Sequence, residues 1–353
     1  MIESEGHRLH LKALVRQERN HAYRRHDYLS HEWQSLARSS SHWSQQQHSS
    51  SEIKDFDEHS NFSPPEKHKA SMMMAQQQQQ QQHHHPRHSP SSVGNMMMIP
   101  DDDDDEDDDA PATASSSDMM CIRWREKIIE WKYQVIDRFD LSREIVSIST
   151  FYLDQYLAMH TVDDELFQLV AMSSIYLAIK IHSPKKVTMR SIASTGNGLI
   201  TVKHIEAMEL SIIETLNWHL FPPTCVSFIE NFYPLLSSST STSSASNHDL
   251  YHPSSYNNDM RLVDSLEFSR FLAELSVCAY PFVSVKPSSI AIAAILYSME
   301  YFGLPDQLRY AFYSDVSDAS LDVNSPEVEA CGKLLRRVYT LAMPLDNNKT
   351  FVA

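Results

Sequence analysis

The chain has 353 residues and a formal net charge of −16, from 30 Lys and Arg against 46 Asp and Glu. Nine of the acids form one run, residues 101–109, and only 6 residues are glycine. This composition argues against a basic nucleic-acid binder and against the glycine-rich loops that hold nucleotide phosphates. The four cysteines are widely spaced and form no CxxC pair, which predicts reduced thiols in a soluble intracellular protein without a metal or cofactor. No apolar run approaches 18 residues, so we expect no contact with a membrane interior.

Residues 1–37 are predicted to be a helical segment. Within 9–37 the apolar residues keep rough helical spacing: Leu11, Leu14, Val15, Tyr23, Leu29, Trp33 and Leu36. An isolated helix of this length is marginal in water, so we expect it to dock on the folded part of the chain.

Residues 38–118 are compositionally biased and include Gln76–Gln82 and the acidic run. They are predicted to be a disordered arm, because they cannot bury enough apolar surface to offset chain entropy.

Residues 119–221 are predicted to be a domain of about five helices, the fourth short and near 187–194. Four stripes of helical spacing support this: Ile128, Trp131, Val135 and Phe139; Val146, Ser149, Leu153 and Tyr156; Leu166, Leu169, Ser173 and Leu177; and Ile205, Met208, Ile212 and Leu216. Helix starts are expected near Ser142, at Thr161 with the acids 163–165 behind it, and at Thr201. Pro222-Pro223 is expected to stop the fifth helix.

Residues 222–345 are predicted to be a second helical bundle, followed by a tail at 346–353. Helices are expected over 224–236, 265–279 and 288–302, with a Ser/Thr-rich loop over 237–247. Ser325-Pro326-Glu327 is typical of a helix start with proline at the first position. No stretch alternates with period two, so the fold class is all-α, two bundles in tandem.

The order and spacing of several short motifs in 120–345 resemble the cyclin family. The motifs are the run from Trp124 to Trp131, the turn Phe139–Glu144, the run Tyr152–Leu157, the helix end Leu169–Lys180, Met208-Glu209 with Leu216-Asn217-Trp218 and Pro222-Pro223-Thr224, and Phe271–Leu275. Residues 9–37 are also similar to the amino-terminal helix of some algal and stramenopile cyclins. The resemblance implies two tandem five-helix cyclin boxes and a non-catalytic regulatory subunit that activates a cyclin-dependent kinase, in cell-cycle control.

The resemblance also implies which residues hold the kinase: Lys180 at the end of the third helix and Glu209 in the fifth. The alternative from the residues alone is that the two side chains only pair with each other, or are simply exposed. Asp154 is expected to brace the bundle. The implied partner is the kinase, which binds the chain as a heterodimer. No nucleic acid, membrane or small-molecule substrate is expected. The implied location is the nucleus, the cytoplasm or both.

A substrate-docking patch is implied at four positions: Trp124, Ile128, Trp131 and Gln168. The chain departs from the family pattern beside it, with Lys127 in place of an aliphatic residue and Gln134 in place of an acid. A cation in this cleft would repel basic docking peptides, which argues against a working patch.

Three Ser-Pro sequences are candidate phosphorylation sites, at Ser63, Ser89 and Ser183. Ser183-Pro184-Lys185-Lys186 resembles the Ser-Pro-x-Lys sequence that cyclin-dependent kinases prefer. The alternative is that Pro184 only ends the third helix.

Two other classes of function were weighed. One is a transcription adaptor of the TFIIB type, which has the same double bundle. Such a protein is expected to carry a basic second bundle and a zinc ribbon. A cyclin that regulates a transcriptional kinase is a variant of this alternative. An enzyme would need converging His and carboxylate groups. The bundle histidines are scattered along the sequence, so no metal site is predicted: His160, His182, His204 and His219.

Overall fold

The structure, a computed structural model, describes residues 2–30, 116–196, 200–242 and 253–343. Every regular element in these ranges is a helix, which confirms the all-α prediction. Most of the predicted arm and the tail at 346–353 lie outside the described residues, as do Ser63 and Ser89.

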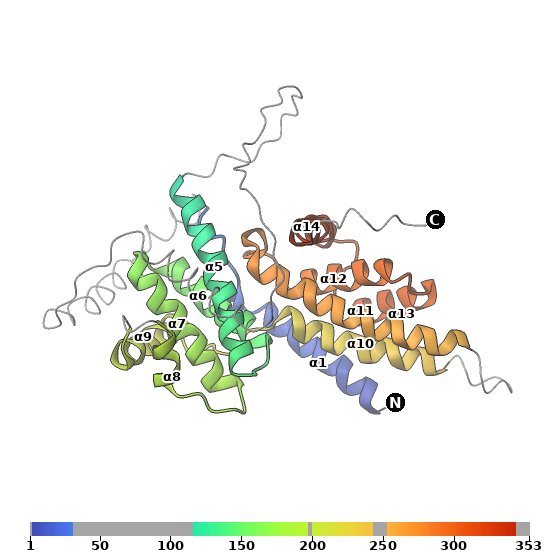
Figure 1. The fold of residues 1–353 in the computed structure, drawn as a ribbon. Coiled ribbons are helices and arrows are strands. Elements are labelled where there is room, and N and C mark those ends of the chain that lie inside the picture. The colour runs from blue at the N-terminus through green and yellow to red at the C-terminus, as the bar shows by residue number, and fades with distance from the viewer. Residues whose placement is uncertain (1, 31–115, 197–199, 243–252, 344–353) are drawn as a thin grey trace, which may run out of the picture. The chain divides into compact units, whose positions relative to one another are not determined.

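The first domain contains the five predicted helices, and the fourth is short. They are α5 (Ser116–Arg138), α6 (Glu144–Met159), α7 (Asp164–His182), α8 (Met189–Ala193) and α9 (Val202–Thr215), grouped in green to yellow-green in Figure 1. Their apolar stripes meet in one buried core. Helix α5 begins at Ser116, two residues before the predicted end of the arm. Once a helix is nucleated, extending it by a few residues costs little.

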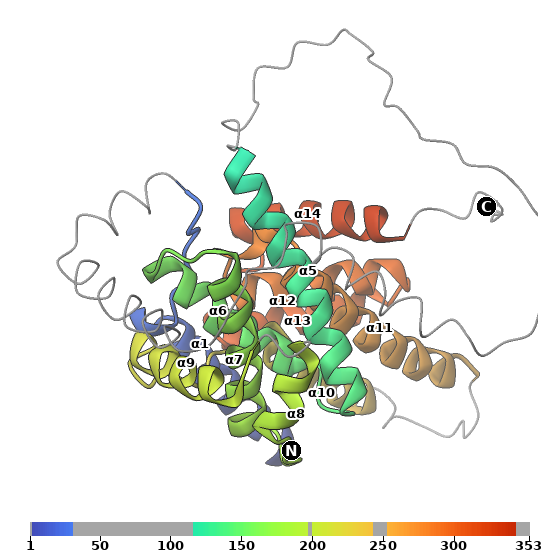
Figure 2. The ribbon, with the colours of Figure 1, turned by 60° about the vertical axis from the view of Figure 1, so that its left-hand side comes forward.

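The second domain also has five helices and its own core. They are α10 (Cys225–Thr242), α11 (Pro253–Cys278), α12 (Pro287–Tyr301), α13 (Asp306–Asp318) and α14 (Pro326–Ala342), coloured yellow to red, and Figure 2 shows them from a second direction. The sequence analysis missed α13, whose buried residues Leu308, Phe312 and Val316 recur every four positions.

Two helices of the second domain are longer than predicted. Helix α11 begins at Pro253 rather than Ser265, and α10 continues to Thr242 through the serines that were expected to form a loop. Ser237 and Ser238 donate hydrogen bonds from their hydroxyls to carbonyls of the preceding turn, at 3.1 and 2.8 Å. This back-bonding occupies the serine hydroxyls inside the helix instead of competing with it.

Local capping explains most of the helix starts. Thr201 caps α9 in a capping box with His204, and Ser325 caps α14 by accepting the Val328 N–H, both as predicted. At α7 the cap is Asp163 rather than Thr161, because the Asp163 carboxylate accepts the Leu166 N–H at 3.0 Å.

Residues 2–30 form a segment that we call the N-terminal strap. Its helix, α1 (Ile2–Glu18), is followed by a short 3-10 turn at His21–Tyr23 and then by extended chain. The helix predicted within 9–37 ends at Glu18 in the described residues, and residues 31–37 lie outside them. Leu11, Leu14 and Val15 are buried in the core of the second domain, where α1 lies along α10 (Figure 1). Packing against this core, rather than local spacing, determines where the helix lies.

The polar contacts of the strap reach both domains. On the second domain, Glu18 accepts two hydrogen bonds from Ser288, from its backbone N–H at 2.8 Å and its hydroxyl at 2.6 Å. On the first domain, the Tyr28 hydroxyl donates to Asp154 at 3.4 Å, and Gln155 donates to the carbonyl of Arg24 at 2.6 Å. The strap thus joins the two domains non-covalently.

Candidate functional site

The ends of α7 and α9 bring together the two residues predicted to hold a kinase. The Lys180 ammonium donates a hydrogen bond to Glu209 Oε1 at 2.7 Å. Lys180 lies in the last turn of α7, where the helix dipole favours a cation. Its side chain is 54% exposed, whereas that of Glu209 is only 10% exposed. The intramolecular pairing that was considered as the alternative is therefore present, and it leaves the ammonium open to solvent.

The electrostatics of this pair keep Lys180 charged. The hydrogen bond with Glu209 raises the pKa of Lys180 above its ordinary value. The ammonium also lies 5.9 Å from the centre of the Tyr176 ring, within the range of a cation–π contact. An exposed cation beside a mostly buried carboxylate can donate to carbonyl oxygens of a partner.

Two exposed aromatic residues follow α9. The helix ends at Thr215, before the prolines expected to stop it, because Asn217 and Trp218 adopt left-handed backbone angles with φ of 46° and 65°. This turn leaves Trp218 71% exposed and Phe221 59% exposed. The Phe221 ring lies 5.0 Å from that of His182, two residues beyond Lys180. The charged pair and an exposed apolar ring therefore share one part of the surface.

The residues of the predicted docking patch lie on α5 and α7. Trp124, Ile128 and Trp131 recur at i, i+4 and i+7 and so share one face of α5. Ile128 is buried in the core, while both tryptophans and Gln168 are partly exposed. The Trp124 ring packs edge-on against Phe167, with 6.1 Å between ring centres. Only Ile128 of these four residues is buried, and the docking role of the patch stays a prediction.

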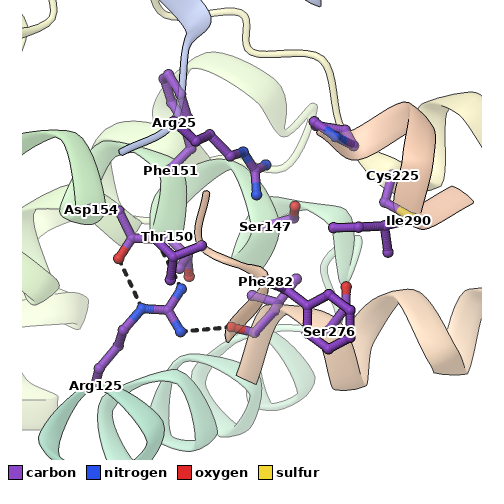
Figure 3. A pocket seen from close by; sticks show the side chains of 13 residues that line it. Arg25, Arg125, Ser147, Thr150, Phe151, Asp154, Cys225, Ser276, Phe282 and Ile290 are labelled. Carbon is purple, nitrogen blue, oxygen red and sulfur yellow. Dashed lines mark hydrogen bonds and ion pairs between the residues drawn. The ribbon is translucent and has the colours of Figure 1, made fainter. Parts of the chain in front are cut away.

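Asp154 braces the first domain, as expected, through a buried ion pair with Arg125. Arg125 Nε and Nη2 donate to the two carboxylate oxygens at 2.9 and 2.8 Å, and Arg125 Nη1 donates to the carbonyl of Val277 at 3.0 Å (Figure 3). Burial acts to lower the pKa of Arg125, but the Asp154 carboxylate outweighs it and the pKa is raised. This pair links α5, α6 and α11.

A small polar cavity lies next to this ion pair. Figure 3 shows the Arg25 guanidinium of the strap entering it near Ser147 and Thr150. The cavity has about 20 Å³ of space for water, enough for one molecule. Thr150 Oγ1 is buried without a hydrogen-bond partner among the described residues, and burial lowers the pKa of Arg25. The cavity has room for a water molecule between the Thr150 hydroxyl and the Arg25 guanidinium, but not for a larger ligand.

One charged residue inside the core was missed by the sequence analysis. Lys132 is fully buried and donates to the carbonyl of Ser149 and to the Ser174 hydroxyl, both at 3.1 Å. Burial lowers its pKa to about 7. The signal was present in the sequence, because Lys132 lies midway between the buried Ile128 and Ile136 on one helical stripe.

The described residues contain no group of three His, Cys, Asp or Glu that could hold a metal ion. Within the same ranges no helix has the length and apolar character needed to cross a membrane. No disulfide joins the four cysteines, all of which lie in described segments. Ser183, the one candidate phosphorylation site that the structure describes, immediately follows α7.

Two family models match the chain. Residues 106–221 match the model "Cyclin, N-terminal domain" and residues 223–350 match "Cyclin, C-terminal domain". Together these matches cover more than half of the chain and include all ten helices α5 to α14.

Curated relatives at low identity include B-type cyclins. The chain is 26% identical over 173 residues to "Cyclin-B1-1" of Oryza sativa subsp. japonica, covering 49% of this chain and 34% of that protein. It is 26% identical over 178 residues to "G2/mitotic-specific cyclin-B" of Patella vulgata, covering 50% of this chain and 38% of that protein. The chain therefore spans less than two fifths of the length of these relatives. Neither supports the likeness to algal and stramenopile cyclins.

Solved structures with a similar fold include a viral cyclin from herpesvirus saimiri, with a TM-score of 0.47, 15% identity and coverage of 63% of this chain and 88% of that one. A chain of the CAK complex from Chaetomium thermophilum has a TM-score of 0.42, 15% identity and 62% coverage of both chains. Cyclin family proteins are non-catalytic regulators of kinases, which agrees with the prediction that the chain is not an enzyme. With both cyclin domains matched in order and two five-helix bundles in the fold, the chain belongs to the cyclin family.

Proposed function

We propose that this chain binds a cyclin-dependent serine/threonine protein kinase as a heterodimer and activates it, in cell-cycle control, in the nucleus or the cytoplasm. The observation that supports this most directly is the Lys180–Glu209 pair at the exposed end of α7. The pair holds a cation at the surface and fixes its position without burying it.

Activation requires the regulator to prefer the active kinase. A kinase is active only when its own Lys–Glu ion pair is formed, which depends on the position of one helix in its small lobe. A regulator that binds the active position of that helix more tightly than the inactive one shifts the kinase population toward activity. The rigid α7–α9 surface is suited to this role, because both helices are anchored in the core of the first domain.

Both members of the pair have hydrogen-bonding capacity left for a partner. The Lys180 ammonium has three donors and uses one on Glu209. The others can donate to backbone carbonyls at the end of a partner helix. Glu209 accepts through Oε1, and we assign Oε2 as the acceptor for a partner backbone N–H. Charge-assisted bonds of this kind contribute about 1.5–3 kcal/mol each when docking removes water from them.

The exposed aromatic residues supply the apolar part of the proposed contact. Trp218 and Phe221 would lose most of their water-accessible area on docking, which stabilises a complex by about 25 cal/mol for each Å² of apolar surface buried. The name "G2/mitotic-specific cyclin-B" of one curated relative supports a role in the cell cycle.

The test is affinity isolation of the full chain from its source cells, with identification of the kinase that co-purifies and an activity assay on a histone-type substrate. Lys180→Ala with Glu209→Ala should weaken kinase binding about a hundredfold or more, the loss of two charge-assisted bonds. A matched control is Glu329→Ala with Lys333→Ala, which removes an exposed ion pair on α14. If the Lys180/Glu209 double variant recruits and activates a kinase as well as the control does, the assigned contact is wrong.

A further inference from the structure

The segment between α7 and α8 is non-helical and carries a Ser-Pro sequence. Ser183 directly follows α7 with extended backbone angles, φ −98° and ψ 135°, as expected for a residue before proline. Residues 184–186 are exposed, and no helix begins again until Met189. A protein kinase needs an accessible, non-helical segment around the acceptor hydroxyl. Ser183 is partly exposed and lies outside the helices, although the chain bends at Pro184 and Lys185.

Ser183 has a lysine three residues before it and another two residues after it in the sequence. Its Oγ accepts a hydrogen bond from the backbone N–H of Lys185 at 3.1 Å, and the Lys185 ammonium binds the carbonyl of Asp140 at 2.6 Å and also its carboxylate. Lys180 is three residues before Ser183, so the two share one face at the end of the helix. A phosphate on Ser183 would therefore lie within one turn of the cation proposed to hold the kinase.

We propose that Ser183 is phosphorylated by a proline-directed serine/threonine kinase and that the phosphate draws Lys180 away from Glu209, weakening the kinase contact. This regulatory step rests on the proposed function of the Lys180–Glu209 pair. In the reaction the Ser183 oxygen forms a bond to the γ-phosphorus of ATP while the bond from that phosphorus to the bridging oxygen breaks. ADP leaves, and the hydroxyl proton passes to a base of the modifying kinase.

Two physical effects of the phosphate both favour the separation of Lys180 from Glu209. Phosphoserine carries a charge of about −1.5 to −2 at pH 7 and competes for the ammonium against a single carboxylate. Lys180 is exposed enough to move, whereas the mostly buried Glu209 cannot follow it. A phosphate after the last turn also opposes the negative end of the α7 dipole, which loosens the turn that carries Lys180.

The modification itself is tested on the folded full chain. Incubation with a proline-directed kinase and ATP, followed by mass spectrometry, should find phosphate on Ser183 in the wild type and none there in Ser183→Ala or Pro184→Ala. Ser191→Ala is the matched control, since Ser191 lies in the next helix and is followed by Ile192. An unmodified Ser183 in the folded wild type would overturn the proposal.

The effect of phosphorylation on Lys180 is tested first in the chain alone and then through kinase binding. The side-chain nitrogen resonance of Lys180, assigned with Lys180→Arg, should shift when Ser183 is phosphorylated, and no shift would overturn the proposed exchange of partners. Phosphorylation should also weaken binding of the co-purified kinase about tenfold or more, as expected for one lost charge-assisted bond.

A Lys180→Gln variant distinguishes the two proposals. It should bind the kinase more weakly than the wild type and should no longer respond to phosphorylation. If Lys180→Gln binds as well as the wild type, the proposed kinase contact fails. If it binds weakly but phosphorylation leaves wild-type binding unchanged, only the regulatory proposal fails.

Discussion

Lys180 and Glu209 are separated by 29 residues in the sequence, and their ammonium and carboxylate groups lie 2.7 Å apart in the structure. The two side chains differ in exposure, since the lysine is more than half exposed and the carboxylate is largely buried. Loss of the lysine leaves a buried charge without its partner, whereas loss of both leaves only a small apolar gap.

This asymmetry predicts that the single variant is less stable than the double variant. Lys180→Ala should lower the free energy of unfolding by about 1 kcal/mol relative to Lys180→Ala with Glu209→Ala, because a buried carboxylate then lacks a hydrogen-bond partner. Urea unfolding of both variants measures the difference. Equal stabilities would mean that Glu209 finds another partner or water.

The helices of the first domain were predictable from the sequence because each carries a long apolar stripe. The stripe from Ile128 to Phe139 is an example: it can be buried only by a helix that packs on its neighbours. Thr201 and Ser325 marked helix starts for a local reason, since their hydroxyls reach backbone N–H groups three residues ahead.

Features that depend on distant contacts were not accessible in the same way. The spacing of Leu11 and Leu14 fits a helix but does not say that it ends at Glu18, where the carboxylate binds Ser288 on another helix. The left-handed turn at Asn217 and Trp218 contains no glycine, the residue that would have predicted such a turn from the sequence. The sequence left open whether Lys180 and Glu209 pair with each other, because spacing along two separate helices does not show how those helices face each other.

Buried Lys132 predicts a pH-dependent stability. Its pKa is lowered by burial to about 7 in the folded chain, while an unfolded lysine titrates near its ordinary value of 10.5. Between these values the unfolded state binds more protons, so stability should rise as the pH increases from about 7 to about 10 and stay at its low level below pH 7.

Substitution of Lys132 by methionine tests this. Lys132→Met should stabilise the chain at pH 7 by roughly 2–4 kcal/mol and flatten its stability between pH 7 and 10. Thermal unfolding across this range gives the profile, and Lys185→Met, which changes an exposed lysine, is the control. A variant profile parallel to that of the wild type would show that Lys132 is charged and solvated in the folded state.

Glu18 is expected to hold the strap on the second domain. Helix α12 begins after Lys286, whose side chain makes no capping bond, and Glu18 supplies the missing acceptor to the Ser288 N–H. Glu18→Ala should destabilise the chain by about 1 kcal/mol, the usual effect of losing a helix cap, and make the strap more sensitive to protease.

Two further variants make this test specific. Glu18→Gln keeps a carbonyl acceptor and should cost less than the alanine change. Glu5→Ala removes an exposed acid from the same helix and should have almost no effect. If all three variants behave alike, Glu18 does not act as a cap.

The Arg125–Asp154 pair should be the most sensitive polar contact between helices. Arg125→Ala leaves Asp154 and the carbonyl of Val277 without their donor in a buried place, which should cost about 3–5 kcal/mol. Arg125→Lys should recover little of the lost stability, since an ammonium cannot make the two parallel hydrogen bonds to the Asp154 carboxylate. Chemical unfolding compares these variants with Arg143→Ala, which breaks more exposed ion pairs and should cost about 1 kcal/mol or less.

The strap gives the chain an unusual connectivity. Residues 2–30 are anchored on both domains, and the next described helix begins at Ser116, so residues 31–115 connect two described segments of one compact unit. Both ends of that connection are held by non-covalent contacts. Since the entropy of closing a loop grows only slowly with its length, the strap can stay in place across a long connection. A single cut within 31–115 would then yield two polypeptides that remain associated through gel filtration and separate only in denaturant.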